Sequence, residues 1–456
     1  MLEKFFEPKS VAVIGASHTP GKIGYVILEN FVRKFSGKVY PVNPDITPIL
    51  NLEVFPSIKK IPEKIDLAII VVPAPVVPTV LKECVEKRVE AVIIISGGFS
   101  ETGEAGRKLE GRCKQIIKKS KTRVIGPNVV GVFDSFSNVD TLFLSEQRLN
   151  RPKQGSIAFI SQSGAVGSTI LDWMGEESVG VSKFISYGNA MDLNECDFLK
   201  FLAKDEKTKV ITMFLEGVRD GKRFVQVAKK VSERKPIIIL KGGKTKAGTK
   251  AVASHTASLA GEYKIYSSVF KQTGIIEAAN WEELFDFAKA FATQPLPKDR
   301  SVVIITDGGG FGVLASDECE KQNLQLQEPE EEMKRKLGKI FPPYAILKNP
   351  LDLTGDATTE RYAIALEKCL KSKQYNGIIL ITLFQVPTLD EKIVEIIPEL
   401  ATKYKKPVLC CAAGGRYTRR QVEKLEASGM PVYPTPERAV KAFAALARYS
   451  EWLKKR

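Results

Sequence analysis

Short apolar runs rich in valine and isoleucine alternate with longer amphipathic stretches along the chain of 456 residues. Runs such as 11–14, 157–160 and 302–305 have the length and the β-branched composition of buried strands. A strand, a helix and a second strand form the unit from which parallel sheets are built. The alternation therefore predicts an α/β protein that contains parallel sheets.

Two polar, proline-bearing segments interrupt this alternation, at 149–155 and at 293–300. A chain of this length is also typical of about three domains of ordinary size. We therefore predict three α/β domains, which span residues 1–150, 151–297 and 298–456.

The second and third predicted domains begin alike. Segments 156–167 and 301–312 each contain a buried strand, a loop of small residues and the start of an amphipathic helix. Their later strands, within 235–243 and 406–415, correspond as well. This pattern predicts a duplicated flavodoxin-like domain, a topology that places ligands at the carboxyl ends of the strands.

The chain carries a net charge of +15, with lysine and arginine spread along it and interleaved with glutamate. It has no basic run with interleaved aromatic residues, no zinc-ligand spacing and no RNA-binding signature. Phosphorylated small molecules therefore explain the charge at least as well as nucleic acid does.

Seven cysteines, an odd number without paired spacing, favour reduced thiols over a disulfide framework or a metal site. The N-terminus lacks the apolar core of a signal peptide, and no apolar run approaches the length of a membrane span. We expect a soluble, cytoplasmic protein that binds neither a membrane nor a metal ion.

A glycine-rich loop follows the first strand and runs from Gly15 to Gly24. Glycines let the backbone approach a phosphate, and the following helix supplies free N–H groups and a positive dipole. The spacing is not that of a dinucleotide fingerprint, and Asn43 stands where an acidic ribose ligand is usual. We expect a nucleotide-bearing ligand other than NAD.

Three more loops in the first predicted domain follow apolar strands, at 71–75, 95–103 and 124–128. Because the carboxyl ends of parallel strands meet at one edge of a sheet, these loops should converge on the same ligand. The alternative is ordinary turn chemistry, since glycine, proline and asparagine also favour turns.

The second predicted domain offers an anion site and a carboxylate. Small hydroxyl residues and helix N–H groups at 161–164 suit a phosphate or an oxyanion. Glu216 follows a strand and would be placed to orient an imidazole and stabilise its charged adduct. The alternative role for Glu216 is that of a surface residue that caps a helix.

His255 is one of only two histidines in the chain, and small residues surround it in segment 251–261. The preceding segment, 242–248, is rich in glycine and lysine. Imidazole is a competent nucleophile at neutral pH, since its unperturbed pKa is ~6.5. The pattern by itself fits two roles equally well, a nucleophile on a basic segment and a surface histidine on an ordinary loop.

Five motifs occur along the chain in this order: Gly15-Ala16-Ser17, the segment 96–103, Gly126-Pro127-Asn128, the segment 161–164 and Ser254-His255-Thr256. In this order they resemble those of the ADP-forming acyl-CoA (acetyl-CoA) synthetase α subunits, relatives of succinyl-CoA synthetase. Segments 306–312 and 349–357 resemble the ligase-CoA domain of the same family. The resemblance implies a Rossmann-like CoA-binding domain followed by two flavodoxin-like domains.

The resemblance also implies the reaction acyl-CoA + ADP + phosphate ⇌ acid + ATP + CoA, through an acyl phosphate and a phosphohistidine. By this analogy His255 carries the phosphoryl group, Glu216 orients His255, and phosphate binds at Gln162, Ser163 and Gly164. The implied CoA-binding residues are Gly15, Ser17, Thr19, Gly21, Gly24, Asn43, Pro73, Ser96, Gly97, Gly98, Phe99 and Asn128.

The chain departs from the family at two positions. Val129 follows Asn128 where many relatives have cysteine, so no thiol role is expected there. Ala257 stands where glycine is usual, which would stiffen the loop slightly.

No segment resembles the ATP-grasp module of the family. We therefore expect a separate β subunit to supply ADP or ATP with Mg²⁺, in an α2β2 heterotetramer. Two other hypotheses remain, a non-catalytic CoA-binding regulatory protein of the same fold and a Rossmann-type dehydrogenase, which the absent dinucleotide spacing disfavours. The motifs do not distinguish acetyl from branched-chain or aryl acyl groups.

Overall fold

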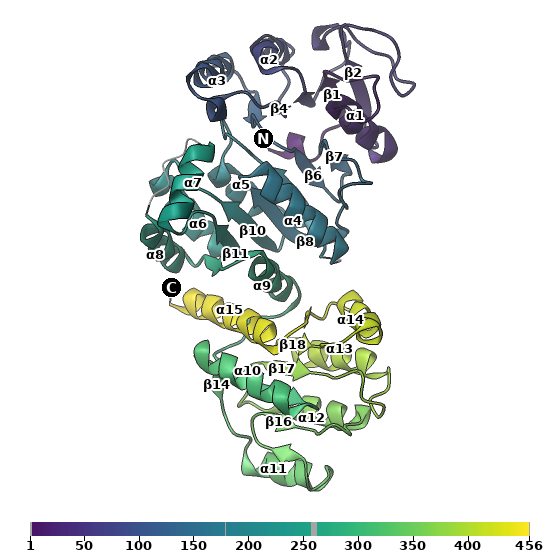
Figure 1. Ribbon diagram of the computed structural model, residues 1–456, viewed down its shortest axis with the longest axis vertical. Coiled ribbons are helices and arrows are strands. Elements are labelled where there is room, and N and C mark those ends of the chain that lie inside the picture. Colours follow the sequence, from purple (N-terminus) through teal and green to yellow (C-terminus); the bar gives the residue numbers. More distant parts are fainter. Residues whose placement is uncertain (1, 178, 257–261, 456) are drawn as a thin grey trace. The chain divides into compact units, whose positions relative to one another are not determined.

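The computed structural model describes residues 2–177, 179–256 and 262–455, and for residues 253–256 it describes the backbone only. The chain divides into two compact units, Met1–Glu277 and Ala278–Arg456 (Figure 1). The first unit contains two sheets and the second unit contains one.

The first sheet has five parallel strands in the order β2-β1-β3-β4-β5. These are β2 (Lys38–Val42), β1 (Ser10–Ile14), β3 (Leu67–Ile70), β4 (Ala91–Ile94) and β5 (Arg123–Ile125). Every residue of the apolar strands β3 and β4 is buried, as expected for parallel strands with both faces covered. The strand order changes direction at β1, so the loops after β1 and β3 form a topological switch point.

Helices and short 3₁₀ turns connect these strands. They are η1 (Glu3–Phe5), α1 (Ile23–Lys34), η2 (Ile58–Lys60), η3 (Ala74–Val76), α2 (Val77–Glu86), η4 (Ser100–Thr102) and α3 (Glu104–Ile117). The helix α1 packs against β1 and β2, and α2 packs against β3 and α3.

The second sheet has the order β12-β11-β10-β8-β9-β6-β7. Its strands are β12 (Ile276–Ala278), β11 (Ile237–Lys241), β10 (Val210–Leu215), β8 (Gln154–Ser161), β9 (Val181–Ser186), β6 (Val132–Asp134) and β7 (Val139–Asp140). The strands β8, β9, β10 and β11 are parallel, whereas β6 is antiparallel to β9 and to β7.

The strands β6 and β7 lie within the first predicted domain, yet they extend the second sheet. A buried ion pair explains part of this arrangement, since Lys183 Nζ on β9 lies 3.1 Å from Asp134 Oδ2 on β6. Both side chains are only 2% exposed. A buried charge of this kind needs its partner, so β6 is held beside β9.

The helices of the second sheet are α4 (Gly164–Glu176), α5 (Glu195–Leu202), α6 (Gly221–Ser232), α7 (Lys246–Thr256) and α8 (Tyr263–Thr273). The helix α4 packs against β8 and β9, whereas α5 and α6 pack against each other. One hydrophobic cluster includes buried residues of both sheets, from Phe5 to Ile275, so the two sheets share a core.

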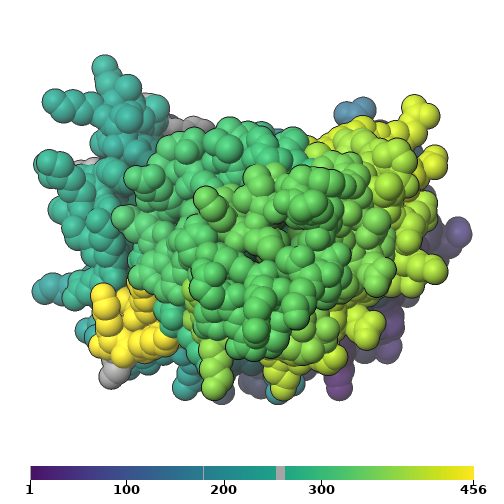
Figure 2. All heavy atoms as spheres, turned by 90° about the horizontal axis from the view of Figure 1, so that it is seen from below, coloured from purple at the N-terminus to yellow at the C-terminus, as the bar shows by residue number. Residues whose placement is uncertain are grey.

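The second unit contains the third sheet, with the order β15-β16-β13-β17-β18-β19 and β14 paired to β13. The strands are β13 (Ser301–Thr306), β14 (Gln325–Leu326), β15 (Ile346–Leu347), β16 (Leu351–Asp352), β17 (Ile378–Ile381), β18 (Val408–Cys411) and β19 (Val432–Tyr433). The helices are α9 (Trp281–Thr293), α10 (Gly309–Lys321), α11 (Glu331–Gly338), α12 (Thr359–Lys371), α13 (Ile393–Tyr404), α14 (Arg416–Ala427) and α15 (Pro436–Lys454). Figure 2 views this unit from the end at which α11 lies in Figure 1, where its green and yellow spheres pack closely.

The α/β fold with parallel sheets is confirmed. The predicted likeness of segments 156–167 and 301–312 also has a structural counterpart, since β8 leads into α4 as β13 leads into α10. The division into domains at 150 and 297 stays a prediction. None of the described helices has the length and apolar character needed to span a bilayer.

Candidate active site

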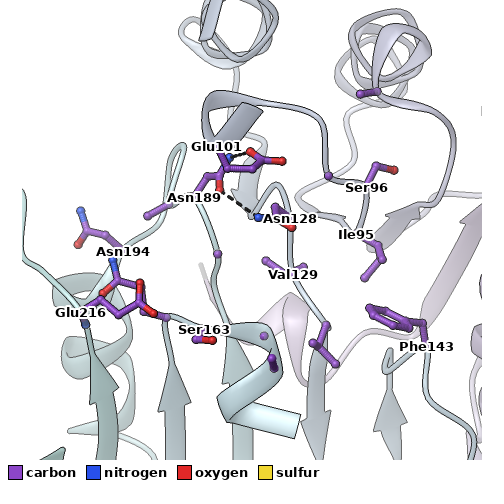
Figure 3. A pocket seen from close by; sticks show the side chains of 18 of the residues that line it. Ile95, Ser96, Glu101, Asn128, Val129, Phe143, Ser163, Asn189, Asn194 and Glu216 are labelled. Carbon is purple, nitrogen blue, oxygen red and sulfur yellow. Dashed lines mark hydrogen bonds between the residues drawn. The ribbon is translucent and has the colours of Figure 1, made fainter. Parts of the chain in front are cut away.

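A cavity of about 820 Å³ lies in the first unit, where loops of the first and second sheets meet (Figure 3). Loops after β3, β4 and β5 line one side, and loops after β8, β9 and β10 line the other. Eight of the predicted site residues line this cavity: Pro73, Ser96, Gly97, Asn128, Gln162, Ser163, Gly164 and Glu216. The structure thus brings together side chains that are up to 143 positions apart, from Pro73 to Glu216.

Asn128 occupies a constrained turn beside the loop after β4. Its φ of 63° lies in the left-handed region, which asparagine tolerates better than most residues. Its backbone N–H donates to the carbonyl oxygen of Ser96 at 3.0 Å. The loop after β5 is therefore joined to the loop after β4.

The N-terminus of α4 lines one side of the cavity. Ser163 is the N-cap of this helix, and its hydroxyl accepts from the N–H of Val166 at 3.4 Å. Gly164 follows at the first helical position and lines the cavity. The free N–H groups and the dipole of a helix N-terminus favour a phosphate at this point.

Gln162 connects the α4 loop to Glu216. Its Oε1 accepts from the backbone N–H of Glu216 at 2.8 Å and from that of Gly217 at 3.1 Å. Because both bonds use the amide oxygen, the Nε2 group is the part of Gln162 suited to donate to an oxyanion.

Glu216 follows β10 directly and is only 6% exposed, so it is not a surface cap. The buried Lys241, at the end of β11, donates from Nζ to the carbonyl oxygen of Glu216 at 2.8 Å and lies 4.6 Å from the ring centre of Tyr266. Burial lowers the pKa of Lys241 to about 8, although the charge of Glu216 raises it in part. The residues around Glu216 therefore fix its backbone and place a cation beside it.

The glycine-rich loop after β1 folds tightly upon itself. Gly24 is buried in α1, and a Cβ at this position would lie 2.1 Å from the carbonyl oxygen of Gly15. Asn43 Nδ2 donates to the carbonyl oxygen of Ala16 at 2.7 Å. Within the loop, Thr19 N–H donates to Ser17 Oγ at 3.1 Å. Gly24 and Asn43 thus shape the loop, and Ile23 is the residue of this region that lines the cavity.

Several predicted CoA-binding residues lie outside the lining of the cavity: Gly15, Ser17, Thr19, Gly21, Gly24, Asn43, Gly98 and Phe99. Phe99 is the least suited to contact a ligand, since its ring is fully buried in a hydrophobic cluster. Its N–H donates to Glu101 Oε1 at 3.1 Å. Phe99 therefore anchors the loop after β4. The ligand contacts of Phe99 and of the other residues stay predictions.

The cavity also contains residues that the sequence analysis did not select: Glu101, Asn189, Asn194, Glu195 and Arg219. Asn189 follows β9 in the segment Tyr187-Gly188-Asn189. The rule used for the other loops, small polar residues directly after a buried strand, would have found it.

His255 belongs to α7, which extends to Thr256, and its side chain lies outside the described residues. The helix α7 lies against η4, which carries Glu101. The predicted role of His255 as a nucleophile therefore stays a prediction. Among the described residues, no three His, Cys, Asp or Glu side chains are grouped to hold a metal ion.

Comparisons with known proteins identify the family of the chain. Family models of a CoA binding domain, a succinyl-CoA ligase like flavodoxin domain and a ligase-CoA domain match residues 9–134, 154–291 and 302–455. The α subunit of acetate–CoA ligase (ADP-forming) I from Pyrococcus furiosus is 42% identical over 461 residues, which cover 99% of this chain and 98% of that protein. The chain belongs to the family of ADP-forming acetate–CoA ligases.

Two further members show how the family is built. The ADP-forming acetate–CoA ligase of Methanocaldococcus jannaschii is 43% identical over 97% of this chain, which spans 62% of that longer protein. Acetyl-coenzyme A synthetase 1 of Ca. Korarchaeum cryptofilum, solved in complex with phosphate and ADP, superposes with a TM-score of 0.93 at 35% identity. That alignment covers 100% of this chain and 98% of the solved one. The resemblance to ADP-forming acetate–CoA ligases, first noted from the sequence motifs, is confirmed.

Proposed function

We propose that this chain is the α subunit of an ADP-forming acyl-CoA synthetase that converts acetyl-CoA, ADP and phosphate to acetate, ATP and CoA. The observation that carries the proposal is the single cavity that unites Ser96, Gly97 and Asn128 with the N-terminus of α4 and Glu216. A thioester and a phosphate must meet in such a reaction, and the cavity offers a place for each. The full-length similarity to acetate–CoA ligases supports the choice of acyl group.

In the first step, CoA binds to the loops of the first sheet with its thioester beside Asn128. Phosphate binds between the N–H groups at the start of α4 and the amide of Gln162. A phosphate oxygen attacks the thioester carbonyl carbon, the C–S bond breaks, and CoA leaves as a thiolate. Catalysis here rests on holding the two reactants in line, which fixed loops and helix ends achieve.

In the second step, an imidazole nitrogen of His255 attacks the phosphorus of the acyl phosphate. The bond between phosphorus and the acyl oxygen breaks, acetate leaves, and His255 carries the phosphoryl group. The carboxylate of Glu216 orients the imidazole and stabilises the positive charge that develops on it. Phosphoryl transfer needs positioning and charge stabilisation more than covalent chemistry from the protein.

The apolar wall of the cavity suits a small aliphatic acyl group. Ile95, Val129 and Phe143 line the side away from Glu216 in Figure 3, and they place no charge against the methyl group of an acetyl thioester. We assign this wall to the acyl and pantetheine end of the substrate.

A separate β subunit completes the enzyme in this proposal. The relative from P. furiosus is named as an α subunit, which implies a second subunit in that protein. The β subunit would hold ADP with Mg²⁺ and accept the phosphoryl group from His255, in an α2β2 heterotetramer. We place the enzyme in the cytoplasm, a reducing compartment in which its seven free, buried cysteines remain thiols.

Phosphorylation of the chain tests the proposal. The purified chain, given acetyl-CoA and labelled phosphate, is expected to take up acid-labile, base-stable label. The same label should appear when the complex with a β subunit is given γ-labelled ATP. Absence of label from both donors would contradict the catalytic proposal and favour a CoA-binding regulatory protein.

The glycine loop gives a second prediction, Gly24→Ala. The added Cβ would lie 2.1 Å from Gly15 O, so α1 and the loop must move apart. Overpacking of this kind costs about 1–3 kcal/mol of folding free energy. We expect CoA binding, measured by calorimetry, to weaken roughly tenfold or more, which corresponds to about 1.4 kcal/mol.

Gly111→Ala is the matched control for this variant. Gly111 lies within α3, and a Cβ there would meet nothing within 4 Å. Alanine is favoured over glycine by about 1 kcal/mol inside a helix, so this variant should be slightly more stable and bind CoA normally. If Gly24→Ala bound CoA with unchanged affinity, the assignment of the glycine loop to the CoA site would be contradicted.

A further inference from the structure

Glu101 joins two loops on opposite sides of the cavity. Its Oε1 accepts from the N–H of Gly98 at 2.6 Å and from that of Phe99 at 3.1 Å, within the loop after β4. Its Oε2 accepts from Nδ2 of Asn189 at 2.6 Å, in the loop after β9 (Figure 3). One carboxylate therefore links the first sheet's loop to the second sheet's loop.

Asn189 extends this link to three more segments. Its Oδ1 accepts from Asn128 Nδ2 at 3.5 Å, and its Nδ2 also donates to Glu110 Oε2 at 3.2 Å. Its backbone oxygen accepts from the guanidinium of Arg219, three residues after Glu216, at 2.8 Å. Asn189 thus contacts the loop of Asn128, the helix α3 and the loop that contains Glu216.

The loop of Asn189 is itself held firmly against the first sheet. Gly188 has a φ of 52°, and a Cβ there would lie 2.2 Å from the carbonyl oxygen of Asn128, so only glycine fits. Asp192 pairs with the guanidinium of Arg123 through two hydrogen bonds of 2.9 Å. Since the loop is held on both sides of Asn189, the backbone of Asn189 has a fixed position from which its side chain reaches Glu101.

Both carboxylates that Asn189 contacts are stabilised as anions. Burial raises the pKa of Glu101, but the hydrogen bonds from Asn189 and from the N–H groups of Gly98 and Phe99 outweigh it, so this pKa lies below its ordinary value. The pKa of Glu110 is lowered in the same way against its burial, by Ser100 and Lys114. Hydrogen bonds to ionised acceptors are roughly twice as strong as neutral ones.

We propose that Glu101 and Asn189 are positioning residues, whose hydrogen bond keeps the CoA-side loops aligned with the phosphate site for the acyl-CoA half-reaction. This inference rests on the proposed function. Attack of phosphate on the thioester requires reactants held by two different sheets to be in line, and a misplacement of ~1 Å can cost ~10²-fold in rate. Transfer between ATP and His255 involves no thioester, so it does not need this alignment, and the only tie to Glu101 on that side is the packing of α7 against η4 among the described residues.

Separate measurement of the two half-reactions tests this inference. Labelling from acetyl-CoA with labelled phosphate reports the first, and labelling of the complex from γ-labelled ATP reports the second. We expect Glu101→Gln to slow the acyl-CoA half-reaction roughly ten- to hundredfold. The amide has only one acceptor oxygen, so it either turns an NH₂ group toward Nδ2 of Asn189 or gives up its bonds to the N–H groups of the loop. The rate of labelling from γ-labelled ATP should stay within about twofold of the wild-type rate, a much smaller change than the loss expected for the acyl-CoA half-reaction.

A matched control and a reciprocal swap sharpen the result. Glu104→Gln makes the same change at a carboxylate that is 74% exposed and pairs with Lys108 on α3, and it should leave both half-reactions unchanged. Asn189→Asp alone places a third carboxylate beside Glu101 and Glu110, and it should impair the first half-reaction. The double variant Glu101→Gln/Asn189→Asp reverses donor and acceptor, so it should recover part of the loss.

Each outcome decides between roles. Selective loss in the single variants with partial recovery in the swap supports positioning. Equal loss of both half-reactions, or a swap no better than the single variants, would overturn the inference while leaving the proposed function intact. Absence of label from both donors in the wild-type complex would instead overturn the proposed function itself.

Discussion

Replacement of His255 by alanine is expected to abolish overall turnover and all acid-labile labelling, while CoA binding stays unchanged. His255 belongs to α7 of the second sheet, whereas the proposed CoA loops follow strands of the first sheet. Loss of the residue that carries the reacting group costs on the order of 10⁶-fold in the best-studied covalent catalysts. A turnover assay with a β subunit, labelling, and calorimetry with CoA measure the three properties.

The second histidine provides the control. His18 Nε2 lies 2.8 Å from the carbonyl oxygen of Thr47, and the side chain is 34% exposed. His18→Ala should therefore still take up label from γ-labelled ATP, the donor that does not use the CoA loop. Label that persisted in His255→Ala would place the phosphoryl acceptor elsewhere, and lost CoA binding in a folded variant would contradict the separation of the two sites.

Strands and the loops after them could be predicted because their signals are local. The strands that precede Gly15, Gln162 and Glu216 each contain a largely apolar run. Where such a strand ends, a ligand loop begins, so the positions of Gln162 and Glu216 followed directly. The burial of Glu216 did not follow, since it depends on Lys241 and Tyr266, which lie on other elements.

Features that depend on distant pairs were missed. The addition of β6 to the second sheet is explained in part by the ion pair between Asp134 and Lys183, 49 positions apart. The loop of Asn189 follows a buried strand as the other site loops do, but the importance of its side chain arises from Glu101, 88 positions earlier. The burial of the Phe99 ring also depends on distant residues of the core, whereas its predicted role in binding CoA stays a prediction.

Glu216→Gln is expected to lower the rate of phosphohistidine formation roughly 10²- to 10³-fold, from either donor. Glutamine keeps the size and the backbone contacts of Glu216, which Gln162 and Lys241 hold. It removes the negative charge that would orient and stabilise a positively charged phosphoimidazole. The rate of labelling from acetyl-CoA with phosphate, and from γ-labelled ATP, measures the effect.

The effect on both donors separates Glu216 from the Glu101–Asn189 pair, whose loss should affect the acyl-CoA side alone. Glu318→Gln is a matched control, since Glu318 is also 6% exposed but belongs to the second unit.

The pH profile of the labelling rate adds a second readout. The charge of Glu216 raises the pKa of Lys241, which burial lowers to about 8, so its removal should lower that pKa further.

Lys241 would then lose its proton at a lower pH, and its hydrogen bond to the Glu216 carbonyl would weaken there. The alkaline limb of the residual labelling rate should therefore shift to lower pH in Glu216→Gln and remain in place in Glu318→Gln. Labelling at the wild-type rate would contradict the role of Glu216 beside His255. A lower rate with an unshifted pH profile would mean that the carboxylate acts on the imidazole of His255 directly and not through Lys241. The two results can be separated because the charge of Glu216 acts on the imidazole and on the ammonium of Lys241 independently.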